Sequence, residues 1–319
     1  MSDRLPPARR RYHVLINSRA GAVLEAGGEA LKARLARAFA AVGAEAAMHL
    51  GAPDQLGGFL ERLTDPEAVP VVVGGDGTVF CLLPALLDCG QPIGILPMGT
   101  MNLLGRDLGL TGPLEADVAA LHRGEIGAVD IGMVNGVPFH SVSGLGFAVA
   151  VASERERARR WFPFSRALAT TVAALRALAR NRPVLIELEM DGQTERLLAD
   201  AALVTVNRFH GTPWRRPRLD EAVLEVHLLA TPNLSARTRA TLAALTGEWR
   251  ELKHLRSFSV TQATLRRGRG TRVMLDGEIV RAAGALSYSI RPRALRVLAA
   301  GRPHAELAHD RRFSERHRR

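Results

Sequence analysis

The sequence is poor in cysteine, and its two cysteines do not form the pattern of a disulfide framework or a zinc site. Cys81 and Cys89 lie eight residues apart in one apolar stretch that is typical of a single buried helix and its end. Disulfide-rich secreted domains and zinc modules need more cysteines than this, at paired spacings. We therefore expect a protein of the reducing cytoplasm.

Long apolar runs are also missing. None of the apolar stretches continues uninterrupted over the roughly 18 residues that a membrane-spanning helix requires. The basic N-terminus, MSDRLPPARRR, is not followed by the apolar segment of a secretory signal peptide. The sequence thus predicts neither a membrane span nor secretion.

Lysine is scarce, because Lys32 and Lys253 are the only lysines among 319 residues. The formal net charge of +11 therefore comes almost entirely from arginine. A basic protein concentrates anions near its surface, and the candidates are nucleotides, nucleic acids and acidic phospholipid headgroups. Hydrophobic residues make up 47% and charged residues 24%, which argues against wholesale disorder and fibrous repeats, and the length favours two domains.

The first part of the chain alternates between β-like and α-like apolar patterns. Short apolar runs typical of buried strands lie at residues 12–17, 46–50, 69–73 and 92–96. Apolar residues at helical spacing lie between and after them, at residues 29–42, 55–63, 79–87 and 101–108. This alternation predicts a parallel sheet that is covered by helices on both faces.

From about Gly127 the pattern changes to short β-rich runs separated by turn residues. These runs lie at residues 129–134, 137–142, 184–190, 202–206, 224–229, 258–264, 272–275 and 286–290. They predict an antiparallel sandwich or barrel, interrupted by one helix near residues 165–180. We therefore expect an α/β domain over residues 1–127 and a β-sandwich domain over residues 128–319, with the final strand a candidate for return to the first domain. The tail after Gly301 is polar and basic, and we expect it to fray.

The stretch Gly74–Thr78, with the sequence GGDGT, follows a buried strand and precedes a helix. At the carboxyl end of a parallel strand, glycines let the backbone approach a phosphate, and the first N–H groups of the next helix point at it. Asp76 would repel a phosphate unless a metal or a transferred proton lay between them, so it suggests Mg-nucleotide chemistry. The alternative is a tight turn in which Asp76 only caps the helix, since short glycine motifs give many false matches.

Two further polar loops follow strands that belong to the same predicted sheet. Asn17–Gly21 comes after the first strand, and Pro97–Asn102 comes after the fourth. Each alone could be an ordinary loop. Because the carboxyl ends of parallel strands meet at one edge of a sheet, the two loops and Gly74–Thr78 form one crevice there, which favours a nucleotide cleft.

A fourth element, Asp276-Gly277-Glu278, lies far away in the sequence at the end of a predicted strand. One interpretation is a hairpin turn with two solvated acids. The other is that Asp276 and Glu278 supply a general base for a hydroxyl acceptor and help to hold a metal. Their spacing alone does not decide between the two.

These elements belong to an ordered set of blocks: NSRAG, GGDGT, LPMGTMNLLGRDLGL, VDIGMVNGVPFHSVSGLGF, RPRLDEAVLEV and LDGE. In this order, over about residues 14–280, the chain resembles the diacylglycerol kinase catalytic family, which includes sphingosine and ceramide kinases and bacterial lipid kinases. The resemblance implies a Rossmann-like parallel-sheet domain, a C-terminal antiparallel β-sandwich and a cleft between them. It also implies transfer of the γ-phosphoryl group of MgATP to the hydroxyl of a diacylglycerol-like or sphingoid lipid.

The resemblance further implies roles for individual residues. Those that would contact ATP are Asn17, Ser18, Arg19, Ala20, Gly21, Gly74, Gly75, Asp76, Gly77, Thr78 and Thr100. Glu278 matches the position of the proton acceptor, with Asp276 beside it, and Asp76 would assist the metal-bound phosphates. The positions that hold a structural Mg ion in bacterial relatives are Arg218, Glu221 and Val223, and oxygen ligands from such a loop suit Mg.

The chain also departs from the family pattern at polar positions. Ser18 stands where proline is common, and Phe80-Cys81 stands where the family commonly has Asn-Glu. Leu103 and Ala148 both stand where an aspartate is usual. Each of the last three changes removes a polar group near the predicted cleft, and the lost aspartates bear on contacts to the lipid headgroup and on any carboxylate relay.

A segment at residues 154–164 joins basic residues to the aromatic residues Trp161, Phe162 and Phe164. This combination suits anionic headgroups and the membrane interface. The alternative is an ordinary solvated helix with Trp161 and Phe164 packed inward. We expect a lipid substrate and peripheral association with the inner face of the membrane, and we leave a homodimer open.

Two other functions and one other ligand class fit parts of the sequence. The basic loop at residues 265–270 lacks interleaved aromatic residues, so we expect a charged hairpin tip and no nucleic acid binding. NAD kinases also carry a GGDGT loop, but the second half of this chain matches lipid kinases better. A weakened lipid-binding or nucleotide-binding module is the other alternative, and the retention of Asp76 and Glu278 argues against it.

Overall fold

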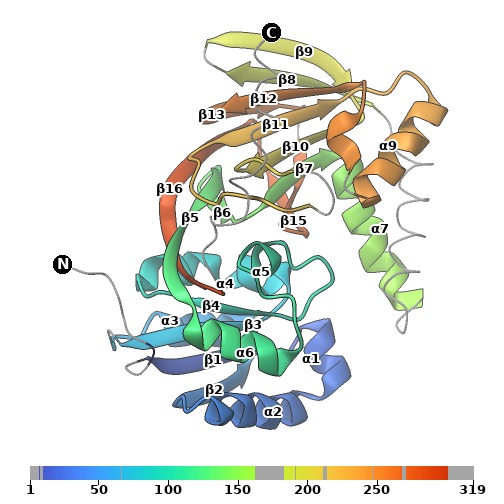
Figure 1. Ribbon diagram of the computed structural model, residues 1–319. Coiled ribbons are helices and arrows are strands. Elements are labelled where there is room, and N and C mark those ends of the chain that lie inside the picture. Colours follow the sequence, from blue (N-terminus) through green and yellow to red (C-terminus); the bar gives the residue numbers. More distant parts are fainter. Residues whose placement is uncertain are drawn as a thin grey trace.

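The computed structural model describes two lobes that lie one above the other in Figure 1. The residues it describes are 7, 10–65, 67–161, 183–190, 192–210, 214–246, 248–267 and 271–300. The helix predicted near residues 165–180, Phe162 and Phe164, the tip of the basic loop and the C-terminal tail lie outside these residues. Among the described helices, none combines the length and the apolar character needed to cross a membrane.

The first lobe is built on a parallel sheet with the strand order β2-β1-β3-β4. Its strands are β1 Arg11–Asn17, β2 Ala46–Gly51, β3 Ala68–Gly74 and β4 Gly94–Pro97. Every residue of β3 is buried, as its continuous valine run requires, because such a strand is covered on both faces. The predicted α/β architecture of this lobe is confirmed.

Helices cover both faces of this sheet (Figure 1). On one face lie α2 Gly28–Ala41 and α6 Leu114–Arg123, and on the other lie α3 Pro53–Leu60 and α4 Asp76–Cys89. Each helix buries leucine or phenylalanine residues against the strands. The short helices α1 Gly21–Ala26 and α5 Leu103–Asp107 follow β1 and β4. The sequence did not predict α1 and α6, since α1 is too short to show a helical period.

The second lobe is a sandwich of two six-stranded antiparallel sheets. Their orders are β12-β11-β10-β7-β14-β15 and β6-β5-β16-β13-β8-β9. The strands are β5 Glu125–Val134, β6 Val137–Phe139, β7 Val142–Gly146, β8 Val184–Met190, β9 Gln193–Ala199, β10 Ala201–Val206, β11 Leu224–Leu229, β12 Leu255–Val260, β13 Gln262–Arg266, β14 Thr271–Leu275, β15 Glu278–Ala282 and β16 Leu286–Ala299. An apolar core between the sheets confirms the predicted sandwich.

Two of the predicted strands are wrong as single elements. The run 258–264 contains parts of β12 and β13, and the run 137–142 contains β6 and the start of β7. In both cases the chain passes from one sheet to the other, so the two halves belong to different ladders. The apolar pattern continues across each corner because both sheets bury their residues in the same core. The strands β9 and β15 and the helix α9 Leu234–Thr246 were not predicted.

The long antiparallel pair β5–β16 connects the lobes (Figure 1). The first half of β16 pairs within the sandwich, whereas Val297 and Leu298 belong to the core of the first lobe. The backbone N–H of Ile93 donates to the carbonyl of Arg296 at 2.9 Å, and the N–H of Leu298 donates to the carbonyl of Ile93 at 2.8 Å. The lobes therefore share a strand pair, and the predicted boundary at residue 127 falls inside β5.

Candidate active site between the two lobes

The glycine-rich loop joins β3 to α4 with almost no intervening chain. β3 ends at Gly74, Gly75 is extended, and α4 begins at Asp76. A Cβ atom at Gly75 would lie 2.9 Å from the Cα atom of Gly99, so the two loops touch backbone to backbone. Glycine is required for this approach. The first N–H groups of α4, which have no acceptor inside the helix, lie at the edge of the sheet, and N–H groups in this position can bind an anion.

A hydrogen bond ties the loop after β1 to the glycine-rich loop. Asn17 Nδ2 donates to Thr78 Oγ1 at 3.0 Å, and the N–H of Arg19 donates to Asn17 Oδ1 at 2.9 Å. Asn17 and Thr78 are both buried. These two side chains therefore set the relative position of two loops as well as bordering the cavity between the lobes.

The third loop closes on itself through Asn102. The N–H of Gly99 donates to Asn102 Oδ1 at 2.6 Å, and Asn102 Nδ2 donates to the carbonyl of Gly99 at 3.0 Å. Asn102 has a φ of 49°, a left-handed conformation that asparagine tolerates better than most residues. This turn leaves Thr100 exposed at the edge of the cavity.

Asp76 occupies a mostly enclosed environment at the start of α4. Burial raises the pKa of its carboxyl group above the ordinary value of 3.8. The charge of Asp276 acts in the same direction, whereas His140 and the N–H groups of Leu103 and Leu104 lower the pKa. These N–H groups belong to the first turn of α5, so Asp76 also connects α4 to α5.

The sequence LDGE forms a two-residue hairpin turn between β14 and β15. Asp276 and Gly277 have φ values of 47° and 96°, the left-handed pair that favours Asp-Gly at such turns. Asp276 is only 6% exposed, so the interpretation of a solvated acid is wrong for this residue. Its carboxylate accepts the backbone N–H groups of His140, Ser141 and Val142 at 2.7, 2.9 and 2.9 Å.

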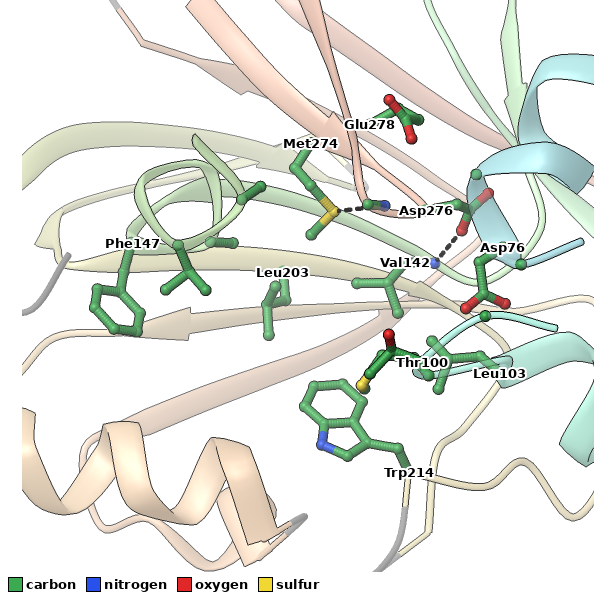
Figure 2. Close-up of a pocket in the computed structure, with 18 of the residues that line it drawn as sticks. Asp76, Thr100, Leu103, Val142, Phe147, Leu203, Trp214, Met274, Asp276 and Glu278 are labelled. Atoms are coloured by element: carbon green, nitrogen blue, oxygen red, sulfur yellow. Dashed lines mark hydrogen bonds between the residues drawn. The ribbon is translucent and has the colours of Figure 1, made fainter. Parts of the chain in front are cut away.

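Glu278 is exposed and reaches across to the first lobe. A Cβ atom at Gly77 would overlap Oε1 of Glu278, so the Glu278 carboxylate lies directly against the first turn of α4. Figure 2 shows the carboxyl groups of Asp76, Asp276 and Glu278 gathered at one end of the cavity. Two lobes that are far apart in the sequence thus supply one acidic cluster.

A cavity of about 540 Å³ extends from the three loops into the second lobe. Its floor belongs to the sheet β12-β11-β10-β7-β14-β15, on the face that points away from the sandwich core. The helices α7 Phe147–Trp161 and α9 cover this floor. Figure 2 shows six of the apolar side chains that line it: Leu103, Val142, Phe147, Leu203, Trp214 and Met274. Trp249, Leu252 and Leu255 line it as well. The chamber was not predicted from the sequence, although Val142 and Leu203 make the second face of their strands apolar as well.

Gly144 allows α7 to lie close to the floor of the chamber. On adjacent strands, Leu203 and Met274 are both register partners of Gly144. A Cβ atom at Gly144 would lie 2.5 Å from the Cβ atom of Ala148 and 2.9 Å from Met274 Cε. Ala148, which replaces the family aspartate, therefore packs against the sheet and makes the chamber wall apolar.

The far end of the chamber is lined by polar side chains. Arg237 of α9 forms an ion pair with Asp200 at 2.6 Å, and the N–H of Thr231 donates to Asp200 at 2.8 Å. The ring of His227 packs edge-on against Trp249 with centroids 4.7 Å apart, and burial lowers the pKa of His227. These contacts hold α9 and the Trp249 segment over the sheet.

The structure places most of the predicted nucleotide and catalytic residues around this cavity. Those that border it are Asn17, Arg19, Ala20, Gly21, Gly75, Asp76, Gly77, Thr78, Thr100, Asp276 and Glu278. Ser18 and Gly74 do not border it, and Gly74 instead contacts Thr78 from behind. Cys81, at a position where the family has glutamate, does border it, and burial together with Glu278 raises the pKa of its thiol.

The predicted metal loop lies elsewhere, before β11, and does not border the cavity. The N–H of Arg208 donates to the Glu221 carboxylate at 3.1 Å, and the N–H of Asn207 donates to the carbonyl of Val223 at 2.8 Å. Arg218 pairs with Asp220 at 3.3 Å. Within the described residues, no group of three or more His, Cys, Asp or Glu side chains could hold a metal. The Glu221 carboxylate and the Val223 carbonyl are thus engaged with Arg208 and Asn207, and a metal ion there stays a prediction.

Family models match both lobes. Residues 11–134 match the diacylglycerol kinase catalytic domain, and residues 141–299 match the YegS C-terminal NAD kinase beta sandwich-like domain. The two matches follow each other along the chain in the order that the sequence blocks predict. They cover the site residues of both lobes, including Asp76 and Glu278.

Curated relatives match over parts of their length. A diacylglycerol kinase of Mycobacterium tuberculosis is 34% identical over 42% of this chain and 44% of its own length. One of Bacillus subtilis is 27% identical over 65% of this chain and 70% of its own length. The match to an uncharacterized Synechocystis protein spans only 20% of that protein. The chain thus spans less than half of the first relatives it matches.

A solved structure shows the same fold. The crystal structure of a diacylglycerol kinase from Bacillus anthracis str. Sterne superimposes with a TM-score of 0.64 at 14% identity, over 91% of this chain and 97% of that one. The fold agreement extends through both lobes. With both domain models matched in order and the resemblance confirmed, the chain belongs to the diacylglycerol kinase catalytic domain family, of the kind that continues into a YegS-type β-sandwich.

Proposed function

We propose that this protein transfers the γ-phosphoryl group of ATP to the hydroxyl group of a neutral lipid. One observation carries the proposal: Asp76 and Glu278, contributed by different lobes, meet where a glycine-rich anion site opens into a chamber with apolar walls. A nucleotide site alone would not need such a chamber. A lipid-binding site alone would not need two acids beside backbone N–H groups.

The polar end of the cavity supports binding of a nucleotide triphosphate. The first N–H groups of α4 and the close approach of Gly75 to Gly99 suit phosphate oxygens. The carboxyl oxygens of Asp76 fit Mg²⁺, which proteins hold through one or two carboxylates together with substrate phosphates. When bound, Mg²⁺ neutralises charge on the phosphates.

Glu278 is the residue placed to accept the proton of the acceptor hydroxyl. It is exposed to the cavity, whereas the oxygens of Asp276 are engaged with three backbone N–H groups. The hydroxyl oxygen forms a bond to the γ-phosphorus, its proton passes to the Glu278 carboxylate, and the bond from the γ-phosphorus to the bridging oxygen breaks to release ADP. Asp76 holds the phosphates in place for this step.

The chamber supports a lipid with no charge next to its reacting hydroxyl. Burial of apolar surface there contributes about 25 cal/mol per Å². Leu103 and Ala148 leave the chamber walls beside the acids without the family's further carboxylates. An ammonium group at this place would lose its hydration and have only the two reacting acids as partners. This favours a diacylglycerol-like alcohol over a sphingoid base.

The test is an incubation of the purified protein with MgATP and, separately, diacylglycerol, ceramide, sphingosine, phosphatidylglycerol and NAD. We expect a phosphorylated product from diacylglycerol, detected by mass spectrometry, and little or none from sphingosine. Phosphorylated NAD would identify an NAD kinase instead. No product from any lipid would indicate a binding module and contradict the proposal.

A further inference from the structure

Arg216 lies at the junction of the lobes and is almost completely buried. The residue is 2% exposed, and each of its guanidinium nitrogens donates a hydrogen bond. Its backbone N–H and Nε donate to the two carboxylate oxygens of Asp107 at 2.9 and 2.7 Å. Nη1 donates to the carbonyl of His140 at 2.7 Å, and Nη2 donates to Ser141 Oγ at 3.0 Å. One side chain thus connects two separate segments.

The first of these segments holds Asp76. Asp107 is the last residue of α5, and its side chain is fully buried against Arg216. The first turn of the same helix provides the N–H groups of Leu103 and Leu104 that bind the Asp76 carboxyl group. Because α5 is a single short helix, a displacement of its end at Asp107 moves the N–H groups that hold Asp76.

The second segment holds the turn that carries Glu278. The carbonyl of His140 and the hydroxyl of Ser141 bind Arg216, while the N–H groups of both residues bind Asp276. Asp276 forms the two-residue turn directly before Glu278. His140 also lies close to the first lobe, with Nε2 at 3.3 Å from the carbonyl oxygen of Asp76.

We propose that Arg216 is a positioning residue that sets the spacing between Asp76 and Glu278 across the two lobes, an inference that rests on the proposed phosphoryl transfer. Arginine suits this role because its planar, forked guanidinium binds a carboxylate and further acceptors at fixed angles, which lysine does not do. A buried ion pair often gives little net stability compared with apolar packing. The Arg216–Asp107 pair instead fixes the relative position of Asp76 and Glu278, which must act on one phosphoryl group.

The test compares three single variants. Arg216→Lys keeps the positive charge but loses the planar, forked guanidinium group. Asp107→Asn keeps the shape of the acceptor side chain but loses its negative charge. Arg250→Lys is the matched control, because Arg250 forms a similar forked pair with buried Glu225 at 2.6 and 2.9 Å entirely within the second lobe. All kinetics are measured below the thermal midpoint of each variant. If Arg216→Lys does not fold, Asp107→Asn gives the same test.

We expect Arg216→Lys and Asp107→Asn each to lower kcat about 100-fold, the usual effect of misplacing reacting groups by about 1 Å. The KM for ATP should change less than about threefold, because the phosphate-binding loops all belong to the first lobe. The kcat of the double variant should fall no further than that of the more impaired single variant, since both changes remove the same contact between Arg216 and Asp107. Arg250→Lys should keep its kcat. A folded Arg216→Lys with wild-type kcat, or an equal loss in Arg250→Lys, would overturn the inference.

Amide hydrogen exchange gives a readout that does not depend on activity. In Arg216→Lys, the N–H groups of Leu103 and Leu104 and those of His140–Val142 should exchange about tenfold faster than in the wild type, whereas Arg250→Lys should leave them unchanged. Unchanged exchange in both segments would overturn the positioning role even if activity fell. A wild-type protein without kinase activity would instead refute the proposed function, and the exchange experiment would still test the connection.

Discussion

Asp76 and Glu278 have the same acidic group in different environments. Asp76 is half-buried and bound by backbone N–H groups, whereas Glu278 is exposed to the cavity. Burial favours the protonated form of Asp76, so this residue has a stronger hold on its proton than an ordinary aspartate. Glu278 is instead open to the cavity, where an acceptor hydroxyl can approach its carboxylate.

The raised pKa of Asp76 leads to a prediction about pH. Asp76 must be ionised to hold the metal-bound phosphates, and the ionised form disappears as the pH falls through its pKa. Because that pKa lies above 3.8, kcat should decline on the acidic side at a higher pH than an ordinary aspartate would cause, with a slope of about one in log kcat. The measurement is kcat for lipid phosphorylation across the acidic range. A rate that stays constant down to the ordinary aspartate pKa would contradict this assignment.

Residue-scale contacts were the least predictable from the sequence. The spacing of Asp276 and Glu278 left solvated turn acids and a catalytic pair both open. In the structure Asp276 binds the N–H groups of residues 140–142, more than 130 positions earlier in the chain. No local pattern encodes such a contact. Arg216 has no sequence signal either, because its role depends on where Asp107 and His140 meet after folding.

At the scale of elements, the packing of α7 on β7 shapes the chamber. We predict that Gly144→Ala lowers the free energy of unfolding by about 1–3 kcal/mol, because the added methyl group overlaps Ala148 and presses on Met274. The same change should raise the KM for the lipid by narrowing the chamber. Urea denaturation and lipid titration measure the two effects.

The control for this prediction is Gly127→Ala. Gly127 also lies in a strand, has no atom within 4 Å of its added Cβ and needs no left-handed conformation. We expect its free energy of unfolding to change by less than about 0.5 kcal/mol. Equal effects of the two substitutions would show that the loss of glycine itself, and not the contact with α7, is responsible.

Elements whose signal is local were predicted well. The valine run of β3 and the glycine-rich start of α4 were recognised because burial on both faces and a tight turn leave direct marks in the sequence. The corners at residues 140–141 and 261 were missed because their apolar pattern does not stop where the hydrogen bonding changes sheet. The chamber was missed because its walls come from strands and helices that are distant in the sequence.

At the scale of the whole molecule, the shared strand pair β5–β16 and the buried Arg216 join the lobes at two places. A site made of groups from both lobes needs such a rigid junction, because phosphoryl transfer depends mainly on positioning and charge neutralisation. The loops that we propose bind the nucleotide lie on the first lobe, and the chamber that we propose binds the lipid lies mostly in the second. The proposed transfer takes place at their boundary.

A whole-molecule prediction concerns the membrane. We propose peripheral association through residues 154–164, supported by their basic and aromatic composition and by the net charge of +11. Replacing Trp161 and Phe162 together by alanine should weaken sedimentation with vesicles that contain anionic lipid, by about tenfold in the partition coefficient. Leu185→Ala, which removes an exposed leucine on β8 of the sandwich, is the control. Undiminished vesicle binding by the double variant would show that this segment does not mediate membrane association.

In the proposed reaction, two acids from different lobes direct the transfer of the γ-phosphoryl group from ATP to a lipid hydroxyl. This reaction is tested by measuring ADP and phosphorylated diacylglycerol together, for the wild type and for Glu278→Gln. The wild type should form the two products in a one-to-one ratio. The variant should bind MgATP but form both products about 1,000 times more slowly, within the range expected when a general base is lost. ADP without phosphorylated lipid, or a variant as fast as the wild type, would contradict the claim.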